Sequence, residues 1–443
     1  MSRKLRAKSA PVPQSRIGRL VRIGIAAGEL AIGGVVEGVR RLGEAKPADA
    51  GSVFLTGSAA RRLAERLSQL RGAAMKLGQI FSLEGKDLVP TEVAEALSIL
   101  RASATPMPRA QLKRVLRREW GAGWEGRFAM FDFEPVAAAS IGQVHRARTV
   151  DGRDLALKIQ YPGVARSIDS DVENVASLLR LARLLPAQID FRDIIAEAKH
   201  QLHQEADYLA EARFLGRYRK LVAGEPRLLV PRVHRDFTTR RILAMDYVEG
   251  EPLEALAGAD VDQGERDAAG ALLEHLLFRE LFEFRVMQTD PNFANYLWDR
   301  QGERMVLLDF GSTREFGADF VEKYRLICRA ILDNDRHAVR RRALEIGYLP
   351  AEASAAAAEA GVDVIMLVCE PIRHRGVYDF PRSDLPSRAR SLGFDLAVRK
   401  GLLRPPPPET IFLHRKLVGG FFILARIGAR VNVHALVRPF LEA

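Results

Sequence analysis

The sequence predicts an α+β fold in two lobes, the first built largely on strands and the second on helices. Residues 142–148 and 154–161, which we interpret as two strands, flank Asp151-Gly152, a dipeptide typical of a tight hairpin turn. The stretch 248–252, which contains Gly and Pro, is typical of a hinge between the lobes. Beyond it the helical period dominates, which is why we assign the second lobe to helices.

The remaining elements follow in chain order. Pro106 and Pro108 end a first helical region, and long stretches with few breakers follow the hairpin. We expect helices over 58–116, 169–185 and 191–221, strands over 228–233, 241–247 and 305–308, and a stiff polyproline spacer at 405–408. The chain then divides into a basic arm with an amphipathic helix (1–50), a helical extension (51–118), a first lobe (119–250) and a second lobe (251–443).

The composition is that of a soluble globular protein, with 47% hydrophobic and 28% charged residues. The two cysteines, Cys328 and Cys369, are too few for a disulfide framework or for a metal site built from cysteine alone. Such low usage is typical of a reducing compartment. We interpret both cysteines as small buried hydrophobic residues.

The net charge of +11 is concentrated partly in the N-terminal arm, whose first 28 residues carry seven basic residues and no acidic one. Such an arm is attracted to anionic membrane lipid or to nucleic acid, unless it is simply a solvated tail. Because no aromatic residues are interleaved with the basic ones, we expect no nucleic-acid partner. Charges interrupt the apolar stretches 17–42 and 417–433, so neither predicts a membrane span. Two glycine pairs would permit the close helix contact of a homodimer: Gly24 with Gly28, and Gly34 with Gly38.

The pattern most informative for function is Asp290 with Asn295 five residues on, followed by Asp309-Phe310-Gly311 fourteen residues after that. This order and spacing are typical of a protein-kinase-like site for phosphoryl transfer. A triphosphate needs Mg²⁺, which binds carboxylate and amide oxygens. Asp309 would hold the metal, Asn295 would complete its ligand set, and Asp290 would orient the attacking oxygen. The predicted α+β fold is therefore protein-kinase-like.

A kinase-like site also needs a lysine on an upstream strand to hold the nucleotide phosphates. Lys158 fits this role, because it lies between apolar residues on the second strand of the predicted hairpin. That lysine needs a carboxylate partner, and the helix predicted over 191–221 offers several. Asp207 and Glu211, four residues apart, would share one face of that helix, whereas Glu205 would point elsewhere. Spacing alone does not choose among the four acids Glu197, Glu205, Asp207 and Glu211.

The loop that covers the phosphates is usually rich in glycine, because backbone N–H groups must approach the anion closely. The corresponding stretch here has three alanines where glycines are expected, and these would stiffen the loop. This departure separates the chain from an ordinary protein kinase. The residues of the stretch that we assign to nucleotide binding are Ala137, Ala138, Ala139, Ser140 and Gly142.

A second departure follows Asp309. An ordinary kinase has a long activation loop at this point, which forms the platform for a peptide substrate. Here residues 312–316 run into a helical pattern within a few positions. We therefore expect a substrate that is small, lipidic or simply water.

Together these residues resemble the UbiB family of atypical kinase-like proteins, over roughly residues 73–316. The most family-specific match is Met75-Lys76-Leu-Gly-Gln79, which fits the family's Lys-x-Gly-Gln signature in a helical extension before the kinase-like core. Lys76 and Gln79 are three residues apart and would project from one face of a helix. The segment Gln288-Thr-Asp-Pro-Asn292 is similar to the corresponding motif in the mitochondrial coenzyme Q branch of the family.

The resemblance implies roles for the residues already singled out. It makes Glu211 the partner of Lys158, and it assigns residues 137–140 to the nucleotide loop. Glu205-Ala-Asp207 matches the family's Glu-x-Asp motif, which would engage Lys76. The positions that match the family's catalytic loop and metal ligand are Asp290, Asn295 and Asp309.

The resemblance also implies a function: a protein that binds ATP and Mg²⁺, hydrolyses ATP and supports ubiquinone (coenzyme Q) biosynthesis at a membrane surface. The helical extension would pack on the active site and block protein substrates. The implied partners are anionic membrane lipid and enzymes of quinone biosynthesis. In a bacterium, the implied location is the cytoplasmic face of the inner membrane. In a eukaryote, it is the matrix side of the mitochondrial inner membrane. Two alternatives stay open: a small-molecule phosphotransferase, against which the Lys-x-Gly-Gln signature argues, and a non-catalytic, nucleotide-gated scaffold.

Overall fold

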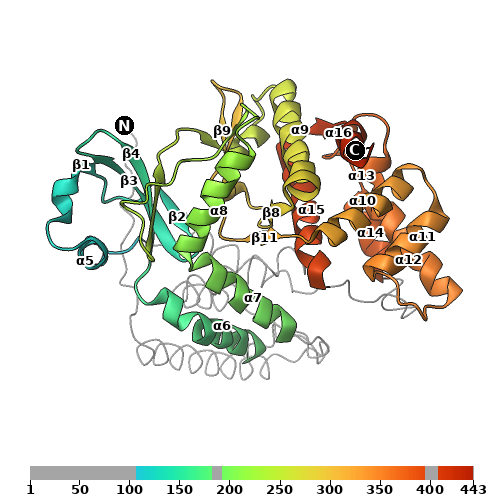
Figure 1. Ribbon diagram of the computed structural model, residues 1–443, viewed down its shortest axis with the longest axis horizontal. Coiled ribbons are helices and arrows are strands. Elements are labelled where there is room, and N and C mark those ends of the chain that lie inside the picture. The colour runs from blue at the N-terminus through green and yellow to red at the C-terminus, as the bar shows by residue number, and fades with distance from the viewer. Residues whose placement is uncertain (1–105, 182–191, 395–407, 443) are drawn as a thin grey trace, which may run out of the picture. The chain divides into compact units, whose positions relative to one another are not determined.

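The computed structural model describes residues 106–181, 192–394 and 408–442, which are drawn in colour in Figure 1. The chain divides into two compact units. The first comprises Met1–Arg213 and Arg232–Tyr247, and the second comprises Phe214–Pro231 and Val248–Ala443. The basic arm, most of the helical extension with Lys76 and Gln79, and the polyproline spacer up to residue 407 lie outside the described residues.

The first unit is built on a five-stranded antiparallel sheet in the order β1-β3-β4-β6, with β2 paired to β3 (Figure 1). β3 and β4 form the predicted hairpin, which pairs from Gly142 opposite Gln160 to Arg148 opposite Asp154. At its turn Gly152 takes a φ of 87°, a left-handed value that glycine adopts without strain. The hairpin and the strand predicted near 241–247 are therefore confirmed. The strands are β1 (Phe128–Phe131), β2 (Ala137–Ala139), β3 (Gly142–Thr149), β4 (Asp154–Gln160) and β6 (Ile242–Asp246).

Helices α7 and α8 correct one prediction. A single helix over 191–221 is wrong, because α7 ends at Glu205 and α8 begins at Tyr208. The side chain of Asp207 accepts a hydrogen bond from the backbone N–H of Ala210 at 2.9 Å, which is how an N-cap residue starts a helix. Asp207 therefore does not share a helix face with Glu211. The helices that begin in the first unit are α5 (Arg109–Trp120), η2 (Trp124–Arg127), α6 (Val164–Leu181), α7 (Arg192–Glu205) and α8 (Tyr208–Leu221).

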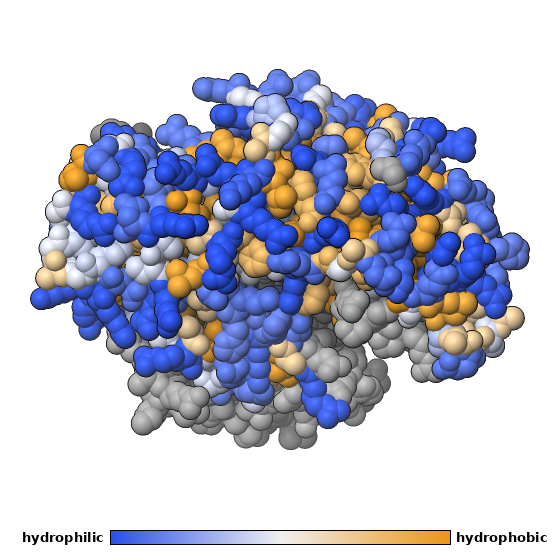
Figure 2. Space-filling view, viewed as in Figure 1, coloured by the Kyte–Doolittle hydropathy of each residue, from blue (hydrophilic) through white to orange (hydrophobic). Residues whose placement is uncertain are grey.

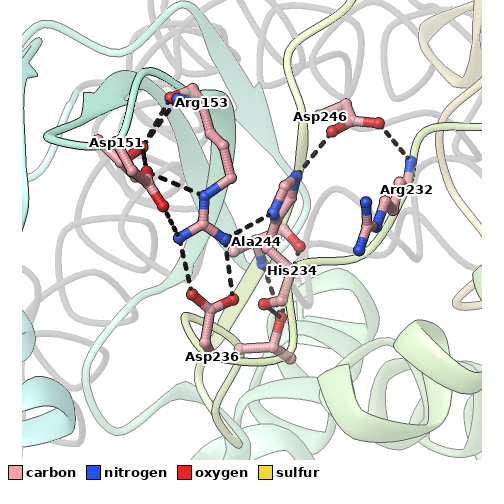
Figure 3. A network of polar contacts seen from close by, with 9 residues as sticks. Asp151, Arg153, Arg232, His234, Asp236, Ala244 and Asp246 are labelled. Atoms are coloured by element: carbon pink, nitrogen blue, oxygen red, sulfur yellow. Dashed lines mark hydrogen bonds and ion pairs between the residues drawn. The ribbon is translucent and has the colours of Figure 1, made fainter.

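A polar network joins the end of the hairpin to the segment that precedes β6 (Figure 3). Nη2 of Arg153 lies 2.8 Å from a carboxylate oxygen of Asp151 and 2.9 Å from one of Asp236. His234 lies between Arg153 and Asp246, with Nδ1 3.2 Å from the guanidinium and Nε2 2.7 Å from the carboxylate. The network thus holds the hairpin turn against the chain that leads into β6.

The described part of the second unit holds a four-stranded sheet in the order β5-β10-β9-β7 and the strand pairs β8-β11 and β12-β13. The strand predicted over 305–308 is confirmed as β10. The strand predicted over 228–233 is shorter than expected, because only Leu228 and Leu229 pair with β10. The strands are β5 (Leu228–Leu229), β7 (Glu251–Pro252), β8 (Val286–Gln288), β9 (Tyr296–Asp299), β10 (Arg304–Leu307), β11 (Thr313–Glu315), β12 (Tyr378–Asp379) and β13 (Arg430–Val431).

Helices make up most of the rest of the second unit, as the sequence predicts. Helices α10, α11 and α12 share a core in which Ile331, Val339, Ala343 and Val362 are almost completely buried. The α-helices are α9 (Gln263–Arg279), α10 (Ala318–Leu332), α11 (Arg336–Ile346), α12 (Ala355–Val368), α13 (Glu370–Arg373), α14 (Leu385–Phe394), α15 (Pro408–Ile427) and α16 (Val433–Glu442). Short helical turns are η3 (Leu253–Ala257), η4 (Glu280–Phe284) and η5 (Phe293–Asn295).

Hydrophilic side chains cover most of the face shown in Figure 2, with hydrophobic residues between them. Four large hydrophobic residues of α15 are also exposed: Ile411, Leu417, Val418 and Phe422. Within the described residues, no helix combines the length and the apolar character that crossing a bilayer requires.

Both cysteines are free thiols and only partly exposed. Burial raises the pKa of both thiols, that of Cys369 to about 12. Neither is therefore a thiolate at neutral pH, which agrees with their interpretation as small hydrophobic residues.

Glu274 on α9 is a buried acid, 9% exposed. Burial, opposed by Lys416, raises the pKa of its carboxyl from 4.5 to about 7. Between these pH values the folded chain binds more protons than the unfolded chain, so the free energy of unfolding falls as the pH rises and levels off above about 7. At 1.36 kcal/mol per unit of pKa, the loss is on the order of 3 kcal/mol. Glu274→Gln removes the titrating group, and we expect it to stabilise the chain at pH 8 but not at pH 5.

Urea unfolding of the wild type and of Glu274→Gln at both pH values checks this prediction. Glu283→Gln is the matched control, because the Glu283 side chain is 45% exposed and pairs with Arg279. A gain in stability of equal size at pH 5 and pH 8 would contradict the assignment of a buried, titrating Glu274.

Candidate functional site

In the first unit, Lys158 on β4 and Glu211 on α8 form a buried ion pair. Nζ of Lys158 lies 2.8 and 3.0 Å from the two carboxylate oxygens of Glu211. The two side chains are 9% and 0% exposed. Of the four acids that the sequence offers, the structure thus pairs Lys158 with the one that the family resemblance implies. Because both hydrogen bonds are short and shielded from water, the ammonium is held in one place.

The alanine-rich stretch is a tight hairpin and not an open loop. Ala137–Ala139 form β2, which folds back on β3 so that Ala137 pairs with Val144 and Ala139 with Gly142. Only Ser140 and Ile141 connect the two strands. Ile141 is 1% exposed and anchors the turn, whereas Ala137 and Ala138 are exposed. The backbone of the stretch is therefore tied to the sheet, as expected of a stiffened loop.

Gly142 lies where the structure accepts no larger side chain. A Cβ at this position would overlap the backbone carbonyl oxygen of Ile159 on β4 and lie 3.0 Å from the hydroxyl of Tyr208. Because that carbonyl cannot shift without disturbing the sheet, we expect Gly142→Ala to lower the free energy of unfolding by about 1–3 kcal/mol. Urea unfolding measures the effect, with Gly126→Ala as the control, since a Cβ at Gly126 meets nothing within 4 Å. Equal stability of the two variants would contradict this prediction and would show that the sheet shifts to accommodate a methyl group at position 142.

The two acids that the resemblance links with Lys76 lie at the junction of α7 and α8. Glu205 ends α7 and is 7% exposed. Asp207 is exposed and caps α8. Lys76 and Gln79 lie outside the described residues, so the engagement of Lys76 by these acids stays a prediction.

In the second unit, Asp290 and Asn295 lie on the turn between β8 and β9. The side-chain amide of Asn295 donates a hydrogen bond to the backbone carbonyl oxygen of Asp290 at 2.9 Å. The side chain of Gln288 donates to the same oxygen at 2.8 Å. Because the amide nitrogen of Asn295 makes this hydrogen bond, its amide oxygen can serve as a ligand of a metal ion.

Asp309 lies close to this turn through backbone hydrogen bonds. The N–H of Leu308 donates to the carbonyl oxygen of Asn295 at 3.0 Å. The carboxylate of Asp309 accepts a hydrogen bond from the N–H of Gly311 at 2.9 Å. The structure therefore brings together the three predicted residues of the second unit, Asp290, Asn295 and Asp309.

The chemistry of these donors fits Mg²⁺, because Asp309 supplies a carboxylate and Asn295 an amide oxygen. No group of three or more His, Cys, Asp and Glu side chains that could hold a metal ion occurs in the described parts of the chain. The other ligands of Mg²⁺ would accordingly be phosphate and water oxygens, which this ion commonly keeps in nucleotide sites.

The chain continues from Gly311 without a long loop. β11 pairs back on β8, with Thr313 opposite Gln288. Helix α10 then begins at Ala318. The expectation that a helix follows Asp309 closely is confirmed.

Two further residues at this site, Arg415 and Lys416, come from α15 and were missed in the sequence. Nη2 of Arg415 lies 2.6 Å from Oδ1 of Asp290. Nζ of Lys416 lies 3.4 Å from a carboxylate oxygen of Glu280 and 3.1 Å from the hydroxyl of Tyr296. Burial alone would lower the pKa of Lys416, but Glu280 and Tyr296 raise it above its ordinary value. No local signal in the sequence distinguishes them, since Arg426 lies on the same helix and is exposed.

The paired strand lysine, the Asp290–Asn295 turn and the Asp-Phe-Gly segment define a protein of the protein-kinase-like class. The chain matches the ABC1 atypical kinase-like domain over residues 99–343, and it belongs to this family. The predicted resemblance to the UbiB family and the predicted protein-kinase-like fold are thereby confirmed.

Two relatives match nearly the whole chain. The chain is 38% identical over 428 residues to the atypical kinase COQ8B, mitochondrial, of Rattus norvegicus, and the alignment covers 96% of this chain and 80% of the relative. It is 36% identical over 434 residues to the atypical kinase COQ8, mitochondrial, of Saccharomyces cerevisiae, and this alignment covers 97% of this chain and 86% of the relative. The structure is similar to that of Rv3197 from Mycobacterium tuberculosis, solved in complex with erythromycin. That match has a TM-score of 0.61 and 26% identity, and covers 86% of this chain and 94% of that one.

Proposed function

We propose that this chain is an ATP-dependent atypical kinase or ATPase that supports ubiquinone biosynthesis at a membrane surface. The observation that carries the proposal is the buried pair of Lys158 and Glu211, 2.8 Å apart. A strand lysine held by a helix carboxylate is how protein-kinase-like proteins present an ammonium to the phosphates of ATP. Membership of the ABC1 atypical kinase-like family supports the same conclusion.

The second unit supplies the groups for the metal ion and the acceptor. Mg²⁺, when bound with ATP, would neutralise the charge of the phosphates. Asp309 and Asn295 would hold it through their side-chain oxygens. Asp290 would orient the acceptor oxygen and receive its proton. The hairpin over 137–142 would cover the phosphates with its backbone N–H groups.

Water, or a small or lipidic molecule, is the acceptor that we propose. The short connection from Gly311 to α10 supports this choice, because a peptide substrate needs a longer docking segment. The helical extension with Lys76, outside the described residues, would be a second obstacle to protein substrates.

The membrane surface is part of the proposal. Seven basic residues among the first 28 would attract anionic lipid. The relatives COQ8B and COQ8 are described as mitochondrial, which supports a mitochondrial location if the chain is eukaryotic. The location that we propose is then the matrix side of the mitochondrial inner membrane. In a bacterium it would be the cytoplasmic face of the inner membrane. The proposed partners are anionic lipid and enzymes of quinone biosynthesis, with a homodimer as a further state to test.

Complementation in Saccharomyces cerevisiae tests the pathway. A strain that lacks the 36% identical relative receives this chain behind a mitochondrial leader, and coenzyme Q is quantified by mass spectrometry. We expect the wild type to restore coenzyme Q and Asp309→Asn to fail. Asp319→Asn, which changes a side chain that is 83% exposed, is the control and should behave as wild type. Failure of a stably expressed wild type would contradict the pathway, and restoration by Asp309→Asn would contradict the role of the metal site.

A further inference from the structure

Helix α15 packs directly on the turn that carries Asp290. A Cβ at Gly419 would overlap the ring of Pro291, so the backbone of α15 lies against the residue that follows Asp290. One helical turn earlier, Lys416 donates to the side-chain oxygen of Gln288 at 3.3 Å. These two contacts determine how α15 lies on the turn, and therefore where the neighbour of Lys416, Arg415, is placed.

Arg415 reaches Asp290 through a short and buried ion pair. The 2.6 Å contact joins side chains that are 6% and 14% exposed. Away from water, opposite charges are screened much less than at the surface. Arg426 on the same helix offers a comparison, because it pairs with Glu254 at 3.4 Å while the two side chains are 64% and 54% exposed. Arg415 is thus coupled far more strongly to its partner than Arg426 is.

Stability does not explain the burial of Arg415. Its Nε and Nη1 atoms are buried, and neither has a hydrogen-bond partner in the described part of the structure. A buried guanidinium with unsatisfied nitrogens is less favourable than an apolar side chain of similar size would be. We therefore look for the reason in what Arg415 does to Asp290.

The backbone and the side chain of Asp290 are held by different groups. Gln288 and Asn295 both donate to its backbone carbonyl oxygen. Arg415 binds its carboxylate and so contributes to the direction in which that group points. Nothing in the sequence pattern of the catalytic loop supplies this contact, because Arg415 comes from the C-terminal helix.

We propose that Arg415 is a positioning residue for phosphoryl transfer, which holds the carboxylate of Asp290 directed at the acceptor oxygen. The inference rests on the proposed function and extends it to α15. In hydrolysis, the water oxygen forms a bond to the γ-phosphorus while the bond from that phosphorus to the β–γ bridging oxygen breaks, and its electron pair leaves with ADP. The proton that the water loses passes to the carboxylate of Asp290 and then to solvent. The carboxylate must therefore point at the water within hydrogen-bonding distance when the step begins.

Removal of Arg415 should misplace the carboxylate of Asp290. The variant keeps the two hydrogen bonds to the backbone carbonyl oxygen of Asp290, so the turn itself is retained. The carboxylate loses its 2.6 Å contact with Arg415 and with it part of its orientation. A proton acceptor that points in the wrong direction slows the chemical step while the binding of MgATP changes little.

The test measures kcat and KM for MgATP at pH 7 with the purified full chain. Arg415→Met is expected to lower kcat on the order of 10- to 100-fold, with a much smaller change in KM. Arg415→Lys keeps a cation near Asp290 and should restore part of the rate. Arg426→Met, at the exposed pair of the same helix, should match the wild type.

The outcomes separate this inference from the proposed function. If Asp290→Asn loses activity while Arg415→Met keeps the wild-type kcat and KM, the inference is overturned and the proposed function stands. If the wild type binds MgADP but turns over no ATP, the proposed function fails, and the inference that rests on it fails as well. Where Arg415→Met does not fold, Arg415→Gln, which keeps a polar side chain, is measured in its place.

Discussion

Asp309→Asn is expected to lower MgATP turnover by at least about 100-fold without unfolding the chain. The substitution removes the carboxylate that we assign to Mg²⁺ and keeps the size of the side chain. An amide oxygen can still accept the hydrogen bond from the N–H of Gly311, which is 2.9 Å long in the wild type. The loss would therefore reflect weaker binding of the metal ion and not a change in the backbone.

Steady-state ATP hydrolysis at a series of Mg²⁺ concentrations measures this effect. A higher Mg²⁺ concentration should recover part of the lost rate, because the variant keeps an oxygen ligand at this position. Asp319→Asn controls for the loss of one negative charge, since that side chain is 83% exposed. Turnover by Asp309→Asn within a few-fold of the wild type would show that Asp309 is not the metal ligand.

Glu211→Ala is expected to be the most destabilising single change at the site, by about 3–5 kcal/mol. The side chain of Glu211 is 0% exposed and that of Lys158 is 9% exposed, so the substitution removes a countercharge from a buried ammonium. The double variant Lys158→Met/Glu211→Leu should regain most of this stability, because an apolar pair of similar volume has no charge to desolvate.

The double variant separates stability from function. Urea unfolding should place it near the wild type, while calorimetric titration should show MgATP binding weakened by about 10-fold or more, since the charge-assisted contact to the phosphates is gone. Glu197→Ala is the control from helix α7, where the carboxylate accepts a hydrogen bond from the side chain of Gln201 at 2.7 Å. MgATP binding as tight as that of the wild type would remove Lys158 from the nucleotide site.

The hairpin of the first unit could be predicted because its signal is local. Asp151-Gly152 supplies the turn, and the stretches on either side of it form β3 and β4, which are of similar length. The order of Asp290, Asn295 and Asp309 was equally informative, because the chemistry of a Mg²⁺-nucleotide site restricts both residue type and sequence order.

The break between α7 and α8 could not be predicted from the helical period. Asp207 is compatible with a helix face and also with an N-cap, and a contact remote in sequence favours the cap. The side chain of Gln160 on β4 donates to the carbonyl oxygen of Ala206 at 2.7 Å, which ties the chain to the sheet where the helix stops.

The role of α15 was missed for a similar reason. Arg415 and its partner Asp290 are 125 residues apart in the sequence, and no local pattern marks an arginine as buried. Arg426 has the same setting in the sequence, an arginine within an apolar helix, and yet it is exposed. The packing of Gly419 on Pro291 and the contact of Lys416 with Gln288 bring this helix to the site.

The central claim is that this chain turns over MgATP at a membrane surface. The most direct test is ATP hydrolysis by the purified full chain, with and without vesicles that contain cardiolipin, beside Asp309→Asn. We predict hydrolysis that the anionic lipid stimulates and that Asp309→Asn abolishes. Tight nucleotide binding without turnover in either lipid condition would contradict the claim and would favour a nucleotide-gated scaffold.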